Sequence, residues 1–417
     1  MPKIKSIKAR QIFDSKAVPT IETLVVLEDG SSARSSVPTG EFHTAYEDVI
    51  LRDDDPKKYD GKGVGNAVKN VNELITPVLV GMEGLHQTEV DKAMIGLDGT
   101  PNKSKLGANP ILSVSQAVAK AAAKSSVLPL ALYLRQFVPS SEKMKMPVPM
   151  FNLIEGGKHG GNSLDFQEFL IIPASSKSFS EAMEIGVSVY HALEAIIYER
   201  SQSALSAKEG GFSPDLPSNQ DGFNLLREAI ESSSFSFSLD LFMGLDACAG
   251  SFLHAKEYKL KDRSEPYTPT DLVAYYKSLT NDYSLTYIED PFGQDDWEGW
   301  KKIHQDLGDK VILTGDDLTS TNPYRLQLAT DNNVIGGVVL KPSQIGTVTE
   351  AIAFAEIAKF KKLKVIVSGR SGETEDKFIA DFAVGVGADY VKFGAPARER
   401  NVKYNRLLEI EDDISKI

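Results

Sequence analysis

The sequence predicts an α/β protein in which an N-terminal α+β domain is followed by a C-terminal β/α barrel. Two observations support this fold class. Three strand-like segments near the N-terminus are followed by helical patterns, which is typical of an α+β domain. After Pro149, short apolar runs alternate with helical segments, and run after run ends in a charged residue. Barrel strands present side chains in this way at their C-terminal mouth. We place the two domains at residues 1–138 and 139–417.

The N-terminal segments carry turn and helix signals in the expected order. Asp29-Gly30 predicts a hairpin turn between the second and third strands. The polar, glycine-containing stretch 38–44 predicts a loop, which we call the lid. The Ala-rich segment 109–125 strongly favours helix. The predicted strands are 3–13, 19–28 and 32–37.

The barrel segments end in a series of ionisable residues. The predicted strands are 150–154, 169–173, 241–245, 285–288, 311–313, 337–340, 365–368 and 389–392, and 179–206 is a predicted helix. The residues at the strand ends are Asp246, Glu289, Asp316, Lys341, Arg370 with Ser371, and Lys392. Any one of them alone would merely cap a buried strand. The whole series, spaced by about one strand-helix unit, is better explained by a cleft at one mouth of the barrel.

The residue types at this mouth indicate metal-assisted acid–base chemistry. Glu289 and Asp316 end neighbouring strands, and hard carboxylate oxygens suit Mg²⁺. Lys341 ends the next strand. A lysine beside a cation has a lowered pKa and can act as a base.

The composition excludes several other classes of protein. The formal net charge of −12 argues against binding to a nucleic-acid backbone. Cys248 is the single cysteine, so a disulfide framework and a thiolate metal site are excluded. The N-terminal residues lack the apolar core of a signal peptide, and no apolar run is long enough to span a bilayer. We therefore expect a cytoplasmic protein.

Long motifs then point to a family. They include 97–109 (LDGTPNKSKLGAN), 209–212 (EGGF), 288–292 (IEDPF), 315–319 (GDDLT), 370–376 (RSGETED) and 394–398 (GAPAR). With these motifs the chain resembles enolase (phosphopyruvate hydratase) over nearly its whole length. The resemblance implies a capping domain, an enolase-type barrel whose first strands are not all parallel, and a homodimer or higher homo-oligomer. It also implies that family members can occur at the cell surface.

The resemblance implies a reaction and its main groups. The reaction would be the reversible, Mg²⁺-dependent dehydration of 2-phosphoglycerate to phosphoenolpyruvate. Two Mg²⁺ would serve each active site, the second arriving with the substrate. Lys341 would remove the α-proton and Glu209 would protonate the departing hydroxide. The ligands of the first Mg²⁺ would be Asp246, Glu289 and Asp316.

The resemblance also implies the remaining site residues. Lys392 would support the substrate carboxylate, and Arg370 with Ser371 would hold the phosphate. Thr39 stands where the family has a serine that closes over the second Mg²⁺. The substrate side of the cleft would be lined by the catalytic residues His159 and Glu168 and by the substrate-binding residue Gln167.

These residue types suit the chemistry. Removing a proton next to a carboxylate gives a doubly charged enediolate, which metal ions and a lysine stabilise; enolase-superfamily sites are a standard example of a Lys or His base with one or two Mg²⁺. Lys341, among positive charges, should be partly neutral. Glu209 should be held protonated by neighbouring carboxylates.

The chain departs from the family pattern around these groups. A family histidine is replaced by Gly369, an asparagine by Glu155, and an aspartate by Lys208. The lid differs at Glu41, Phe42 and His43. We hypothesise that His43 contacts the phosphate or Glu209, and that Glu41 joins the second Mg²⁺. Two alternatives stay open: a superfamily dehydratase for another acid, and a catalytically weak paralogue kept as a binding or surface protein.

Overall fold

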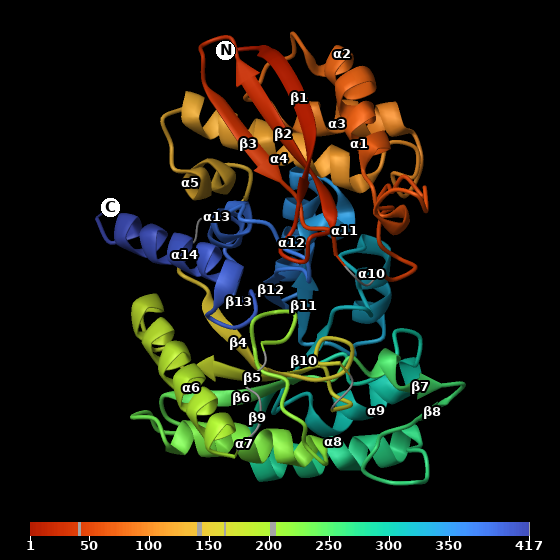
Figure 1. The fold of residues 1–417 in the computed structure, drawn as a ribbon, viewed down its shortest axis with the longest axis vertical. Helices are drawn as coiled ribbons and strands as arrows, with labels where there is room; N and C mark the ends of the chain where they lie inside the picture. Colours follow the sequence, from red (N-terminus) through yellow and green to blue (C-terminus); the bar gives the residue numbers. More distant parts are fainter. Residues whose placement is uncertain (41–42, 140–143, 162–163, 201–205, 417) are drawn as a thin grey trace.

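The computed structural model describes residues 1–40, 43–139, 144–161, 164–200 and 206–416. Its N-terminal part is an antiparallel sheet in the order β1-β2-β3, packed against helix α4 (Figure 1). The predicted turn joins β2 to β3, with Gly30 at φ +88° and the Asp29 carboxylate accepting the N–H of Ser31 at 2.8 Å. The elements are β1 (Ile4–Phe13), β2 (Pro19–Leu27), β3 (Ser32–Ser36), α1 (Gly65–Lys69), η2 (Asn70–Ile75), α2 (Thr76–Leu79), α3 (Gln87–Asp98), α4 (Ala108–Ser125) and α5 (Leu130–Arg135).

The C-terminal part is a closed barrel with the strand order β10-β11-β12-β13-β4-β5-β6-β9. Strand β5 is antiparallel to both β4 and β6, whereas the other neighbours are parallel. This confirms the predicted fold class, including first strands that are not all parallel. The strands are β4 (Val148–Glu155), β5 (Glu168–Pro173), β6 (Leu241–Asp246), β9 (Leu285–Glu289), β10 (Ile312–Gly315), β11 (Gly337–Leu340), β12 (Lys364–Ser368) and β13 (Tyr390–Lys392).

Helices surround the barrel, and side-chain caps define where several of them begin. Ser178 and Glu181 form a capping box at α6, and Thr268 and Asp271 form one at α8. Helix α6 ends at Glu199, where Arg200 leaves helical geometry; of the predicted helix 179–206, residues 201–205 lie outside the described residues. The helices are α6 (Phe179–Glu199), α7 (Asn219–Glu231), α8 (Pro269–Tyr283), α9 (Trp297–Leu307), α10 (Pro323–Asp331), α11 (Pro342–Ile345), α12 (Val348–Phe360), α13 (Phe378–Gly385) and α14 (Asn401–Ile414).

The reversal of β5 decides which residues meet at the barrel mouth. Because β5 runs against its neighbours, its first residue, Glu168, lies beside the last residues of β4 and β6. The register pairs Glu168 with Glu155 on one side and with Asp246 on the other, and Asp246 pairs with Glu289 of β9. Four acidic residues therefore follow one another around the rim.

The two parts of the chain pack together through helices and loops. Helix α5 packs against α13, and the N–H of Thr39 donates to the carbonyl of Gly372 at 3.0 Å. We propose that the domains divide between residues 138 and 139. Among the described residues, no helix is both long enough and apolar enough to cross a membrane.

Candidate active site

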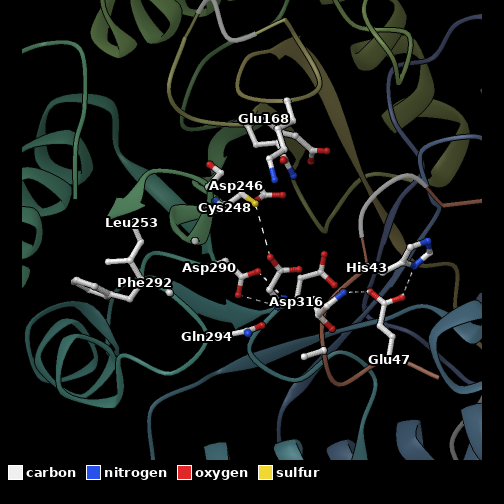
Figure 2. A pocket seen from close by; sticks show the side chains of 18 of the residues that line it. His43, Glu47, Glu168, Asp246, Cys248, Leu253, Asp290, Phe292, Gln294 and Asp316 are labelled. Atoms are coloured by element: carbon white, nitrogen blue, oxygen red, sulfur yellow. Dashed lines mark hydrogen bonds and ion pairs between the residues drawn. The ribbon is translucent and has the colours of Figure 1, made fainter. Parts of the chain in front are cut away.

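A cavity of about 820 Å³ opens at the barrel mouth, beneath the end of the lid. Figure 2 shows carboxylates of the barrel on one side and His43 and Glu47 of the N-terminal domain on the other. Of the residues predicted for the site, Glu289 and Thr39 do not line the described cavity wall. Those that line it are His159, Gln167, Glu168, Glu209, Asp246, Asp316, Lys341, Arg370, Ser371 and Lys392.

Lys392 ties together the carboxylates on the rim. Its Nζ lies 2.8 Å from Glu168 Oε2, 3.0 Å from Asp246 Oδ2 and 2.8 Å from Glu289 Oε2. Burial opposes the charge on Lys392, but the surrounding carboxylates outweigh it and hold its pKa well above the ordinary value. Glu289 is fully buried behind Lys392, which explains why it does not line the cavity.

Carboxylates outnumber cationic groups around Lys392. Burial, followed by the charges of Glu168 and Asp316, raises the pKa of Asp246 to about 6 although Lys392 opposes the shift. Burial and Asp246 likewise hold the pKa of Glu289 well above its usual range. Burial is the larger cause of both shifts, and the neighbouring carboxylates add to it.

Lys341 forms an ion pair with Asp316 Oδ2. Burial lowers its pKa, but Asp316 outweighs burial, so the pKa of Lys341 lies above its ordinary value. The expectation of a partly neutral Lys341 is therefore wrong for this arrangement. The reason is that Lys341 itself neutralises Asp316, a predicted ligand.

The acidic groups fit a divalent cation. Asp316 Oδ1 is buried and has no hydrogen-bond partner among the described residues. Its ligand atoms lie within 4.8 Å of those of Asp290 and Asp317. Asp290 is committed to the backbone, because its carboxylate accepts the N–H of Asp316 at 3.1 Å and of Asp317 at 2.7 Å. An unpartnered carboxylate oxygen amid excess negative charge is a suitable Mg²⁺ ligand.

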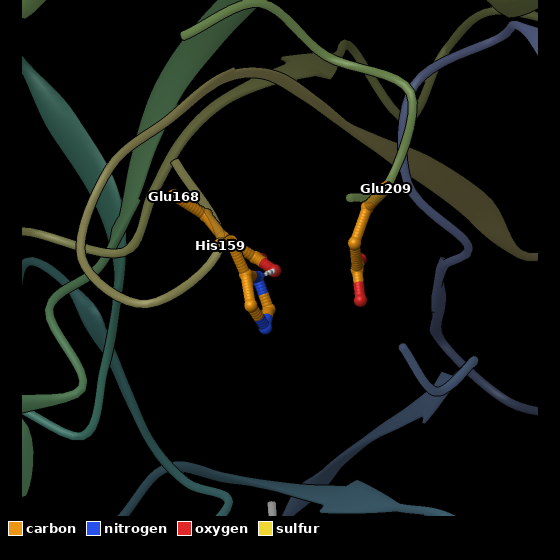
Figure 3. Close-up of side chains that lie close together, drawn as sticks. All are labelled: His159, Glu168 and Glu209. Atoms are coloured by element: carbon orange, nitrogen blue, oxygen red, sulfur yellow. Dashed lines mark ion pairs between the residues drawn. The ribbon is translucent and has the colours of Figure 1, made fainter. Parts of the chain in front are cut away.

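His159, Glu168 and Glu209 form a second cluster, with ligand atoms within 4.8 Å of one another. Figure 3 shows His159 and Glu209 reaching the same space from two different loops. His159 Nδ1 lies 3.4 Å from Glu168 Oε1. Burial opposes protonation of His159, but Glu168 and Glu209 raise its pKa. Such a cluster of nearby titratable groups can move protons.

Arg370 and Ser371 follow β12 and meet residues of the N-terminal domain. Arg370 Nη1 binds Glu47 Oε2 at 2.8 Å, and Arg370 Nη2 lies 3.5 Å from His43 Nδ1. Lys16 Nζ donates to Ser371 Oγ. His43 therefore lies beside Arg370, the residue predicted to hold the phosphate, and its contact with a phosphate stays a prediction. Sequence reasoning missed Glu47, because it does not lie near β12 in the chain.

The lid residue Thr39 does not face the cavity. Its hydroxyl donates to Asp14 Oδ2, and it is 4% exposed. The predicted contact of Thr39 with the second Mg²⁺ stays a prediction. Glu41 and Phe42 lie outside the described residues. Gly369, next to Arg370, is closely surrounded: a Cβ there would lie 3.3 Å from Arg400 Nη1 and from Glu373 Oε1, which is tighter than an ordinary contact.

The fold and the cavity define a two-domain protein in which an α+β domain caps a β/α barrel. Acidic residues and lysines line the mouth of that barrel. Residues 4–134 match the family model for the enolase N-terminal domain. Residues 143–417 match the model for the enolase C-terminal TIM barrel domain. The chain belongs to the enolase family.

Proposed function

We propose that the protein catalyses the reversible, Mg²⁺-dependent dehydration of 2-phosphoglycerate to phosphoenolpyruvate, as a hydro-lyase of glycolysis. The observation that carries this proposal is that one cavity contains an amine, Lys341, an acidic cluster with Glu209, and the anion-binding pair Arg370–Ser371. A base, an acid and an anion site around one space are what a phosphorylated hydroxy acid requires.

The first step removes a proton from substrate carbon 2. Lys341 accepts this proton as the neutral amine, after it has lost the proton that its ion pair with Asp316 retains. Mg²⁺ held by Asp246, Glu289 and Asp316 would supply positive charge to the substrate carboxylate and so stabilise the enediolate. Lys392, buried beside these carboxylates, adds positive charge at the same end of the cavity.

The second step breaks the bond between carbon 3 and its hydroxyl oxygen. Glu209 donates a proton to that oxygen, so that water leaves and the double bond forms. Hydroxide is a poor leaving group, which is why an acid is needed. Glu209 is 7% exposed, and this burial limits competing proton exchange with solvent.

The phosphate is held at the opposite side by Arg370 and Ser371. A guanidinium group binds phosphate through two parallel hydrogen bonds. The phosphate must compete with Glu47, which binds Arg370 in this structure. Retention of this pair is also what argues against an acid substrate without a phosphate.

The test is the appearance of phosphoenolpyruvate, followed by its absorbance, when purified protein is mixed with Mg²⁺ and 2-phosphoglycerate. We expect turnover that stops when the metal is chelated. Turnover that is unaffected by a chelator would overturn the metal assignment. No turnover with this substrate would overturn the proposed reaction.

A second candidate is a catalytically weak binding protein. The observation that favours it is the missing side chain at Gly369, next to Arg370. In that case 2-phosphoglycerate would bind and raise the thermal unfolding temperature without measurable product. We infer a cytoplasmic homodimer in either case, and sedimentation equilibrium tests the assembly state.

A further inference from the structure

Glu155, the last residue of β4, is a fully buried carboxylic acid behind the acid–base cluster. Both of its oxygens accept the N–H of Glu209 at 3.0 Å, and Oε1 also accepts the N–H of Gly211 at 2.8 Å. Strand β4 and the loop that carries Glu209 are joined further by the Glu155 N–H, which donates to Phe212 O at 2.8 Å. The backbone at Glu209 is thus held to the barrel through one side chain.

The contact is too close for a side chain at position 211. A Cβ on Gly211 would lie 2.8 Å from Asn152 O and 3.1 Å from Glu155 Oε1. Real Cβ atoms rarely approach a neighbour so closely, so glycine permits this backbone to reach the carboxyl group. The loop backbone therefore packs directly against the Glu155 carboxyl group.

The charges facing Glu155 come from several elements. Glu209 from its loop and Glu168 from β5 are acidic, whereas His159 and Arg400 are basic, and Tyr190 lies on α6. Arg400 Nη2 is 3.9 Å from Glu209 Oε1 rather than bound to Glu155. Burial, followed by the charge of Glu209, raises the pKa of Glu155 to about 8 despite the opposing effect of His159.

Burial and the charge of the neighbouring Glu209 both disfavour a negative charge on Glu155. We propose that Glu155 is a positioning residue for Glu209, which fixes the backbone of Glu209 and keeps one proton on the pair of carboxyl groups. The mechanistic part of this inference rests on the proposed function. The proton would be the one that Glu209 gives to the leaving hydroxide, and solvent would return it after turnover.

The proton on the pair can be measured without substrate. Infrared difference spectra between acidic and alkaline protein report the carbonyl stretch of a protonated, buried carboxyl group. Wild type should lose a band with a midpoint near pH 8, distinct from the loss near pH 6 expected for Asp246. Glu155→Gln should lack this band, because glutamine retains a carbonyl acceptor for the two N–H groups but cannot hold the proton.

The decisive variant is Glu209→Gln, which removes the neighbouring charge and leaves Glu155 in place. The midpoint should then fall by at least about one pH unit. An unchanged midpoint, or a band that persists in Glu155→Gln, would overturn the inference. Circular dichroism checks the fold, and if Glu155→Gln does not fold, the Glu209→Gln spectra decide alone.

The pH dependence of kcat gives a second test of the proposal. In wild type, kcat for dehydration should fall above about pH 8, where the pair has lost its proton. In Glu155→Gln this alkaline limb should move to lower pH by at least about one unit, with little change in KM. A purely structural role would lower kcat at all pH values without moving the limb, and that result would contradict the proposal. Inactive wild type with the expected infrared titration would refute the proposed reaction but not the shared proton.

Discussion

Arg370 and Glu47 form a buried ion pair between the barrel and the N-terminal domain, with 2.8 Å between Nη1 and Oε2. The two side chains are only 6% and 3% exposed. The lid backbone lies against the same guanidinium group, since a Cβ on Gly40 would be 2.8 Å from Nη2. An anion that binds Arg370 must therefore compete with Glu47.

Removing the Glu47 carboxylate should make the unfolding temperature of the protein depend on added phosphate. Glu47→Gln leaves the buried Arg370 charge without its partner, which typically costs about 3–5 kcal/mol. Inorganic phosphate should restore part of this loss by binding Arg370, so it should raise the unfolding temperature more in Glu47→Gln than in wild type. The control is Glu409→Gln, which breaks an exposed ion pair with Lys377. Equal phosphate effects in wild type and Glu47→Gln would contradict this view of the pair.

The same ion pair should appear in the pH dependence of stability. Burial opposes ionisation of Glu47, but Arg370, and then His43, hold its pKa well below the usual range. A depressed carboxyl pKa contributes stability that is present above the unfolded pKa, roughly 4.3, and is lost as pH falls toward the folded value. Between about pH 5 and pH 2, urea unfolding should show wild type losing about 2 kcal/mol more than Glu47→Gln. Parallel curves for the two proteins would argue that the pair contributes nothing.

Asp316→Asn should weaken Mg²⁺ binding by at least about tenfold while the fold survives. The amide is nearly the same shape but carries no charge, and Asp316 has a carboxylate oxygen available for a cation. Calorimetric titration measures the affinity, with the exposed Asp413→Asn as control. Equal Mg²⁺ affinity in Asp316→Asn and wild type would remove this residue from the proposed ligands.

A double-mutant cycle tests whether His43 replaces what Gly369 lacks. His43 lies 3.5 Å from Arg370 Nη2, so it can contribute to the phosphate side. His43→Ala should therefore lower kcat/KM, and should cost less once Gly369→His is also present. We expect a non-additivity above about 0.5 kcal/mol. Additive effects, or a harmless His43→Ala, would instead favour a lid histidine that faces solvent.

The barrel and most of the cavity wall follow from local patterns. Each strand is a short apolar run with its functional group at the end, as in Leu285–Glu289, and parallel strands bring such ends together. Contacts between distant parts of the chain have no such signal. Glu47 and Arg370 are separated by 323 positions, and nothing near either residue predicts the pair.

The hydrogen-bond partners of individual side chains also could not be predicted from the sequence. Thr39 has the expected position in the lid, but its hydroxyl binds Asp14 rather than facing the cavity. The pKa of Lys341 was predicted to fall because neighbouring cations were expected to dominate, whereas the bond to Asp316 dominates in the structure. Glu155 could be recognised as unusual from the sequence, but its bonds to the Glu209 backbone depend on the fold of a distant loop.

The central claim is that Lys341 and Glu209 perform separate proton transfers, and exchange of the substrate α-proton in deuterated water tests it most directly. Lys341→Ala should abolish both exchange and dehydration, each role being worth about 10²–10⁴-fold. Glu209→Gln should slow dehydration by a similar factor yet still exchange the α-proton, because that proton leaves before the hydroxide does. Loss of exchange in Glu209→Gln as complete as in Lys341→Ala would contradict the account.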